Sequence, residues 1–275
     1  MNKEKKGSWL LFGLTLIFTI IFVSPLYFSL ISAFKTNGEI MRDPTSFPSS
    51  LYLKNFVTLW QKTKFPEAFL NSVILTVSAE LFIILIIPIA AYALERNKSK
   101  LSGLIYIYFI AGMMIPFQSY MIPLFKELKV LHMFGNFFGP VVIYISGATA
   151  FGTLLFTSFI KGVPKDIEES AAIDGCSNFM IFWRIVFPLL TPCTASLVIL
   201  NGLGIWNDFL MPMLVLPSGK AKTINVEIYS FVAEFSSRWD IVFAGVICGI
   251  VPILIVFVSL QKYFIKGITA GAAKG

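Results

Sequence analysis

The sequence predicts an all-α membrane protein with six transmembrane helices, and two observations support this prediction. Of the 275 residues, 56% are hydrophobic and only 13% are charged, and the mean hydropathy is +0.80. Soluble domains carry about 45–50% apolar and about 25% charged residues, so an ordinary soluble enzyme, a disordered chain and a disulfide scaffold are excluded. The apolar residues also gather in six runs, each long enough for the roughly 20 residues of a membrane-spanning helix. These runs are 9–34, 69–94, 101–120, 140–160, 189–216 and 241–264.

The first run has features of a secretory signal, because lysines precede it and residues 31–33 look like a cleavage site. Its apolar stretch is longer than the 7–15 residues of a signal core, and Pro25 lies inside it. We therefore interpret it as a retained first helix. In the third run, residues 113–118 interrupt the apolar pattern at Pro116, which predicts either a gate or a simple kink.

Six spans place both termini on one side of the membrane, and lysine and arginine counts favour the cytoplasm only weakly. The compact basic turn at residues 96–100 is the best single support for this orientation. The net charge of +7 comes from short clusters between apolar runs, which suits lipid headgroups and not nucleic acid. The predicted organisation is a cytoplasmic N-terminus (1–8), a first helix (9–34), a polar outer loop (35–68), a membrane core (69–264) with a cytoplasmic loop (161–188), and a cytoplasmic tail (265–275).

The cytoplasmic loop predicts a short helix outside the membrane. Pro164 suits the first helical position, the acidic residues after it suit the positive end of the helix dipole, and Gly175 suits its C-terminal stop. A second helical stretch covers 178–186 and ends before Pro188. Small residues leave one face of the first helix nearly flat, so it either docks into a groove on another protein or only connects two spans.

A family resemblance begins in this loop. Glu169, Ser170 and Ala171, then Gly175 after three residues, then Ile185 and Pro188 resemble the E-A-A-x3-G-x9-I-x-L-P signature of ABC importer permeases. Serine replaces the first alanine and phenylalanine replaces the leucine, while every spacing matches. Residues 171–177 are similar to the form typical of carbohydrate permeases, as are the W-N-D-F string at 206–209 and the tail at 261–272. The chain thus resembles the six-helix second permease of maltose-type sugar importers.

The resemblance implies a type I ABC importer permease fold in a bacterial cell membrane, with both termini cytoplasmic. It implies a homologous second permease, two ATPase subunits, and an extracellular lipid-anchored or periplasmic solute-binding protein as partners, with a sugar as substrate. The EAA helix would sit in a cleft of an ATPase and transmit its closure, with Glu169 facing basic groups and Ala171 permitting close approach. The residues implied for this coupling are Glu169, Ser170, Ala171, Ala172, Asp174, Gly175, Ile185 and Pro188, with Lys266, Gly267 and Gly271 near the ATPases in the tail.

Four polar or aromatic residues inside the spans are candidates for the sugar path. Glu80 lies near the middle of the second span, where a carboxylate costs at least about 2.5–3.5 kcal/mol to insert. It predicts a polar contact on the sugar path or between two permeases, or else a protonated or hydrogen-bonded packing group. Trp206, Asn207 and Asp208 combine a ring with polar groups, which suits sugar binding or an interhelical hydrogen-bond node. Gly245 and Gly249 form a GxxxG pattern that predicts close helix packing.

The sequence offers no catalytic machinery of its own. It has no GxxxxGK[ST] phosphate loop, so ATP would be bound and hydrolysed, with magnesium, on a partner chain. The single histidine and three scattered cysteines predict no cofactor, no metal site and no enzyme. The remaining alternative is an ion-coupled secondary transporter, but no internal repeat of the kind typical of that class is visible.

Overall fold

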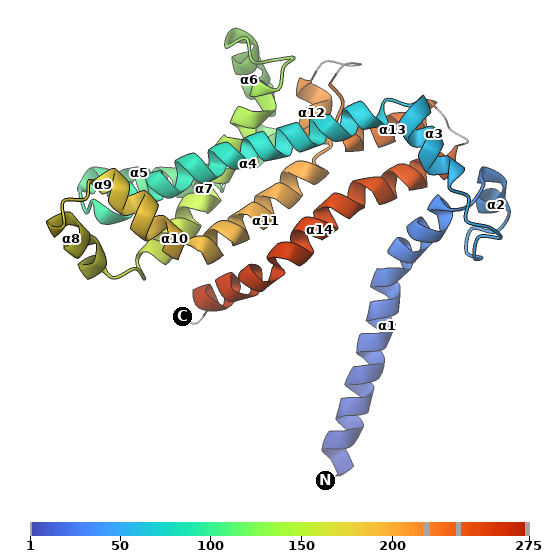
Figure 1. Ribbon diagram of the computed structural model, residues 1–275, viewed down its shortest axis with the longest axis horizontal. Helices are drawn as coiled ribbons and strands as arrows, with labels where there is room; N and C mark the ends of the chain where they lie inside the picture. Colours follow the sequence, from blue (N-terminus) through green and yellow to red (C-terminus); the bar gives the residue numbers. More distant parts are fainter. Residues whose placement is uncertain (1, 217–220, 235–237, 273–275) are drawn as a thin grey trace. The chain divides into compact units, whose positions relative to one another are not determined.

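The structure is a computed structural model that describes residues 2–216, 221–234 and 238–272, and every regular element within these ranges is a helix (Figure 1). The all-α prediction is therefore confirmed. The helices are α1 (Asn2–Ala33), α2 (Asn37–Arg42), α3 (Lys54–Lys62), α4 (Phe65–Arg96), α5 (Lys100–Gly112), α6 (Phe117–Val130), α7 (Phe138–Ile160), α8 (Lys165–Ile173), α9 (Asn178–Ile181), the π-helical turn η1 (Phe182–Val186), α10 (Phe187–Leu189), α11 (Thr191–Asn207), α12 (Leu210–Val215), α13 (Ile224–Glu234) and α14 (Trp239–Ala272).

Four of the predicted spans are single helices and two are broken. The segments Leu11–Ala33, Phe65–Arg96, Phe138–Ile160 and Trp239–Gln261 are each long and apolar enough to cross a membrane. The α5–α6 pair is bent by 106°, and the helices Asn178–Leu189 and Thr191–Asn207 meet at 75°. Counting each bent pair as one span gives up to six spans by length and composition, the predicted number. The second bent pair begins at Asn178, inside the predicted loop 161–188, and not at residue 189 as the sequence predicts.

The break in the third span falls where the sequence places it. α5 ends at Gly112 and α6 begins at Phe117, with Pro116 as the residue before α6. Proline lacks the N–H that would continue the helical ladder, which explains why the helix ends here. The structure therefore contains a sharp turn at this point and not a mild kink.

The chain divides into two compact units. The first comprises residues 1–68 and 224–251. In it, the Lys35 ammonium is fully buried and donates to the backbone carbonyls of Asp43 and Pro44 at 3.0 and 3.1 Å. Asn55 donates to the carbonyls of Ala33 and Lys35, so the segment after α1 folds back onto the end of that helix.

The GxxxG pattern also lies in the first unit, where it allows close packing on α13. A methyl group at Gly245 would lie 3.3 Å from the Ile228 side chain, and one at Gly249 would lie 3.2 Å from Ile224. The prediction of close helix approach at these two glycines is confirmed.

The second unit comprises residues 69–223 and 252–275 and contains both candidate sites. One face of α4 is buried every fourth residue against α7 and α11 (Figure 1). At the closest approach, a methyl group at Gly152 of α7 would lie 2.9 Å from Cγ2 of Ile87. The α4 residues of this core are Leu75, Ala79, Ile83, Ile87 and Ala91.

The basic clusters gather at one end of the second unit. Glu95 pairs with Lys98 at 2.7 Å and with Lys161 at 3.9 Å, so the turn after α4 and the end of α7 lie together. At the other end, the Gly135 amide donates to the Val215 carbonyl. The predicted cytoplasmic loop and basic turn therefore share one end of the unit.

Candidate functional site

The EAA helix predicted from the sequence is α8. Pro164 precedes the helix as its N-cap, one residue earlier than predicted. Gly175 has a φ of +85°, the left-handed conformation that glycine adopts without strain. The Gly175 amide donates to the Ala172 carbonyl and the Cys176 amide to the Ala171 carbonyl, which is the Schellman arrangement for ending a helix. The predicted role of Gly175 as the helix stop is confirmed.

A half-buried ionic cluster holds α8 on the end of α4. The Glu168 carboxylate accepts hydrogen bonds from the Arg96 guanidinium at 2.5 and 3.0 Å and from the Tyr92 hydroxyl at 2.7 Å. Arg96 also donates to the Val163 carbonyl at 3.0 Å, so it contacts the segment before α8 as well. We call Tyr92, Arg96 and Glu168 the α4–α8 clamp. The sequence analysis used Glu168 only as an acidic residue of the first helical turn and missed this contact.

The remaining signature residues divide between an exposed and a buried face. Ala171 is buried in the core of the second unit, where its small side chain lets α8 pack closely. The predicted coupling residues Glu169, Ser170, Ala172 and Asp174 are exposed. Ile173 is also exposed, over 87% of its surface.

The second half of the loop is helical as predicted, but it is not one regular helix. It consists of α9, the π-helical turn η1 and α10. Ile185 packs against the core of the second unit, whereas Pro188 is exposed in α10. The wider turn of a π-helix is often found at functional positions.

A groove of about 660 Å³ runs beside α8. The clamp residues line it, and so does Phe179 of α9, which is exposed over 71% of its surface. The groove and the exposed face of α8 together form a surface with both charged and apolar groups, which suits contact with another protein.

A second cavity, of about 320 Å³, lies between α6, α7 and α11, and we call it the polar pocket. The Tyr144 hydroxyl donates to Asp208 Oδ2 at 2.9 Å, while Asp208 Oδ1 accepts from the amides of Leu210 and Met211. Asp208 therefore ends α11, caps α12 and presents a carboxylate to the cavity. Asn201 adds a buried amide whose Nδ2 finds no acceptor among the described residues.

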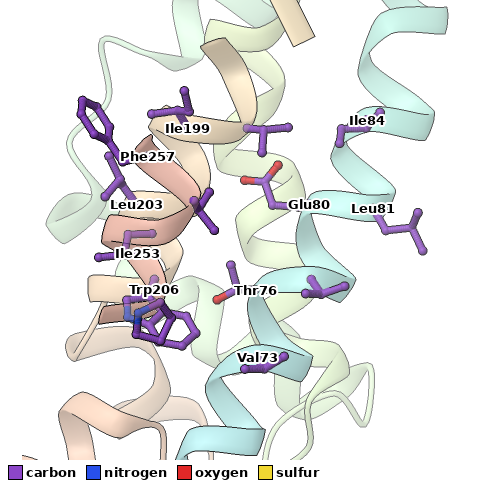
Figure 2. A pocket seen from close by; sticks show the side chains of 15 residues that line it. Val73, Thr76, Glu80, Leu81, Ile84, Ile199, Leu203, Trp206, Ile253 and Phe257 are labelled. Carbon is purple, nitrogen blue, oxygen red and sulfur yellow. The ribbon is translucent and has the colours of Figure 1, made fainter. Parts of the chain in front are cut away.

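The structure separates Asp208 from its neighbours in the W-N-D-F string. Trp206 lies on the opposite face of α11, where its ring packs edge-on against Phe69 at 6.0 Å and lines a different pocket with Glu80 (Figure 2). The exposed Asn207 side chain donates to the Leu203 carbonyl of its own helix. The four candidate path residues therefore do not form one site.

Two residues of the polar pocket were missed by the sequence analysis. Asn201 lies seven residues before Asp208, two helical turns along the same face, so that spacing was a usable signal. Tyr144 belongs to a different span, and only the fold reveals its contact with Asp208.

Lys266, Gly267 and Gly271 lie outside the residues whose side chains the structure describes. Within the described ranges, no group of three or more histidine, cysteine, aspartate or glutamate residues is arranged to hold a metal ion.

The chain is similar to permeases over its whole length. It is 37% identical to the probable starch degradation products transport system permease protein AmyC of Thermoanaerobacterium thermosulfurigenes, over 100% of both chains. It is 33% identical to the multiple sugar-binding transport system permease protein MsmG of Streptococcus mutans, again over 100% of both chains. It is 31% identical to the melibiose/raffinose/stachyose import permease protein MelC of Bacillus subtilis, over 91% of each chain.

A solved structure shows the same fold. A chain of a bacterial ABC transporter involved in the import of the acidic polysaccharide alginate matches with a TM-score of 0.86 and 19% identity, over 96% of this chain and 98% of that one. The model of one protein family, described as the binding-protein-dependent transport system inner membrane component, matches residues 85–270. Permeases of this family carry no cofactor. The chain belongs to this family and is a multi-pass permease subunit of an ABC importer that depends on a binding protein, not an enzyme.

Proposed function

We propose that this chain forms half of the transmembrane path for a mono- or oligosaccharide in a bacterial cell membrane, with both termini cytoplasmic. The names of AmyC, MsmG and MelC, all sugar permeases, support a sugar as substrate. A homologous second permease supplies the other half of the path. An extracellular lipid-anchored or periplasmic binding protein delivers the sugar. Dependence on a binding protein favours this function over ion-coupled secondary transport.

The Tyr144–Asp208 hydrogen bond in the polar pocket is the observation that carries the sugar-path proposal. A phenol, a carboxylate and the amide of Asn201 offer both donors and acceptors to sugar hydroxyls. Tyr120 and Phe117 add aromatic rings to the same wall. The cavity volume is at the lower end of the roughly 300–1,000 Å³ typical of small-molecule sites, which fits one sugar ring entering from a larger shared path.

The polar pocket is tested by uptake of radiolabelled maltotriose and raffinose into proteoliposomes that contain the whole importer. Tyr144→Phe removes only the hydroxyl, and Asp208→Asn keeps the oxygen that caps α12. Asn207→Ala is the matched control, because Asn207 is the exposed neighbour of Asp208 and donates to a carbonyl of its own helix. We expect the first two variants to lower uptake at least about tenfold, the cost of one or two charge-assisted hydrogen bonds, and the control to change it less than about twofold. Normal uptake by both pocket variants would refute the sugar-path proposal.

The second part of the proposal is that α8 couples the path to two partner ATPase subunits. Its support is the exposed face of α8, where Glu169 and Ile173 project beside the groove at the basic end of the unit. We propose that Glu169 meets basic groups of the ATPase. Glu169→Lys should leave the chain in the membrane while abolishing sugar uptake, since like charges would then face each other.

The coupling test compares Glu169→Lys with Ser170→Ala, a small change on the same exposed face. Membrane content, ATPase activity and sugar uptake are measured for each variant. Normal uptake by a fully inserted Glu169→Lys variant would rule out the coupling role of this residue.

A further inference from the structure

Glu80 is a buried carboxyl group without a partner among the described residues. Only 7% of its surface is exposed, and neither carboxyl oxygen has a hydrogen-bond partner in the described part of the chain. Within the same residues, the buried hydroxyl of Thr76, one turn earlier on α4, also has no partner. Figure 2 shows both side chains pointing toward the same pocket. Two adjacent unsatisfied polar groups inside a membrane span carry a cost of several kcal/mol unless something supplies their hydrogen bonds.

The pocket that these groups face is apolar and half open. Its volume is about 440 Å³, and its walls come from α4, α11 and the Pro252–Phe257 part of α14. A methyl group at Gly202 would lie 3.6 Å from Glu80 Oε1, so the bare backbone of α11 leaves the carboxyl group accessible. The walls are otherwise formed by aliphatic side chains and the aromatic rings of Trp206 and Phe257.

The pocket lies on the face of α11 opposite the polar pocket. Residues 199, 202, 203 and 206 line the Glu80 pocket, and residues 201, 204, 205 and 208 line the polar pocket. With 3.6 residues per turn, these two sets point in opposite directions. Glu80 is therefore separated by a helix from the sugar path proposed above.

Depth in the membrane limits what can reach Glu80. It is 15 residues from Phe65 and 16 residues from Arg96, the two ends of α4. At 1.5 Å per residue these distances are about 22 and 24 Å, which places Glu80 near the middle of a hydrocarbon layer about 30 Å thick. A lipid headgroup lies too far away to donate a hydrogen bond there, whereas a membrane-spanning segment can carry a donor to this depth.

We propose that the Glu80 pocket is a socket for a transmembrane helix of the second permease, which inserts an amide or hydroxyl side chain that hydrogen-bonds Glu80 and Thr76. This inference rests on the proposed pairing of two permeases. An uncharged donor fits because the walls are apolar and offer nothing else to stabilise a cation. Polar side chains that bond across helices are a common means of association in membranes, where apolar contact alone gives little preference over lipid.

Site-specific photo-crosslinking in native membranes tests which molecule fills the socket. A benzophenone amino acid is placed at Val77, which lines the pocket, or at Ile86, which is comparably exposed on the opposite face of α4. We expect the Val77 probe to crosslink to the second permease and the Ile86 probe not to do so. A Val77 probe that reaches only lipid, or that gives the same products as Ile86, would overturn the proposal.

Co-purification separates failure of this inference from failure of the proposed function. If a second permease and an ATPase co-purify with the tagged chain but Val77 does not crosslink to the permease, only the socket is refuted. If no second permease co-purifies in mild detergent, the proposed function itself fails, and the socket fails with it.

Two substitutions at Glu80 test the hydrogen bond. Glu80→Gln keeps an acceptor at the same place, whereas Glu80→Leu removes it and leaves the partner's donor buried. Interhelical hydrogen bonds of this kind correspond to about a threefold to twentyfold change in association. We therefore expect Glu80→Leu to retain about threefold to twentyfold less second permease under a graded detergent challenge, and Glu80→Gln to retain a nearly normal amount. Equal retention by wild type and Glu80→Leu would contradict a bonding role.

Discussion

Breaking the α4–α8 clamp by Glu168→Gln should loosen α8 without removing the signature residues on its exposed face. In the native chain, the Glu168 carboxylate accepts two charge-assisted bonds from Arg96 and one bond from Tyr92. Glutamine keeps the shape and one acceptor oxygen, but it removes the charge that faces the guanidinium. Arg96 would then be left half-buried with only the Val163 carbonyl and weaker contacts.

The free-energy cost of Glu168→Gln depends on how deeply the ion pair is buried. Breaking a fully buried ion pair costs about 3–5 kcal/mol, and a hydrogen bond to a charged group contributes about 1.5–3 kcal/mol. The Arg96 and Glu168 side chains are 16% and 11% exposed, so water can replace part of the lost interaction. A local cost of about 2 kcal/mol is therefore reasonable, which corresponds to about 30-fold faster opening of α8.

Amide hydrogen exchange measured by mass spectrometry on the purified importer reports this opening directly. The peptide that covers α8 should exchange about 30-fold faster in Glu168→Gln, while peptides from α7 should be unchanged. Glu169→Gln is the matched control, because it removes the same charge from the exposed neighbour on the same helix. Native exchange of α8 in Glu168→Gln, or equal acceleration in the control, would refute the reasoning.

Three further predictions concern single positions. Gly175→Ala should destabilise the end of α8 by about 1–2 kcal/mol, since a side chain at φ +85° is strained; circular dichroism of the membrane fraction should show normal helix content, while exchange at residues 171–176 should rise. Gly152→Ala should lower the melting temperature of the purified complex, because the new methyl group would lie 2.9 Å from Ile87 and overpacking costs about 1–3 kcal/mol. Adding Ile87→Ala should recover part of the lost stability. An unchanged melting temperature in the Gly152→Ala variant would show that the two helices separate freely. Hydrogen bonds from Ser49 and Thr36 lower the pKa of Glu39 to about 2, so residues 36–49 are stabilised above the ordinary pKa of glutamate and lose this stabilisation as the pH falls toward 2. Protection factors of residues 36–49 should fall over that range in wild type but not in Glu39→Gln.

The sequence predicted the elements of this fold better than it predicted contacts between them. Apolar runs of about 20 residues are a strong local signal, and the stop at Gly175 depends only on the backbone freedom of that residue, so both were predictable. The break at Pro116 was visible as an unusual residue inside an apolar run. Its bend angle was not predictable, because it depends on packing, and the second bend, between Leu189 and Thr191, was not predicted.

In the candidate sites, too, local features were predictable from the sequence but contacts between distant residues were not. The W-N-D-F string looks like one cluster in the sequence, but the twist of α11 sends Trp206 and Asp208 to opposite faces. Glu168 and Arg96 are 72 positions apart, and Tyr144 and Asp208 are 64 positions apart, so their contacts are tertiary. No local pattern distinguishes Glu168, which turns inward, from Glu169, which is exposed.

The clamp attaches one end of the long helix α4 to α8, so a movement of α8 would tilt α4. From Arg96 to Glu80 the arm is about 24 Å long, at 1.5 Å per residue. A swing of about 5° at the clamped end would move Glu80 sideways by about 2 Å, enough to stretch a hydrogen bond of about 2.9 Å beyond its useful range. A tilt too small to change the helix itself can therefore make or break a contact in the middle of the membrane.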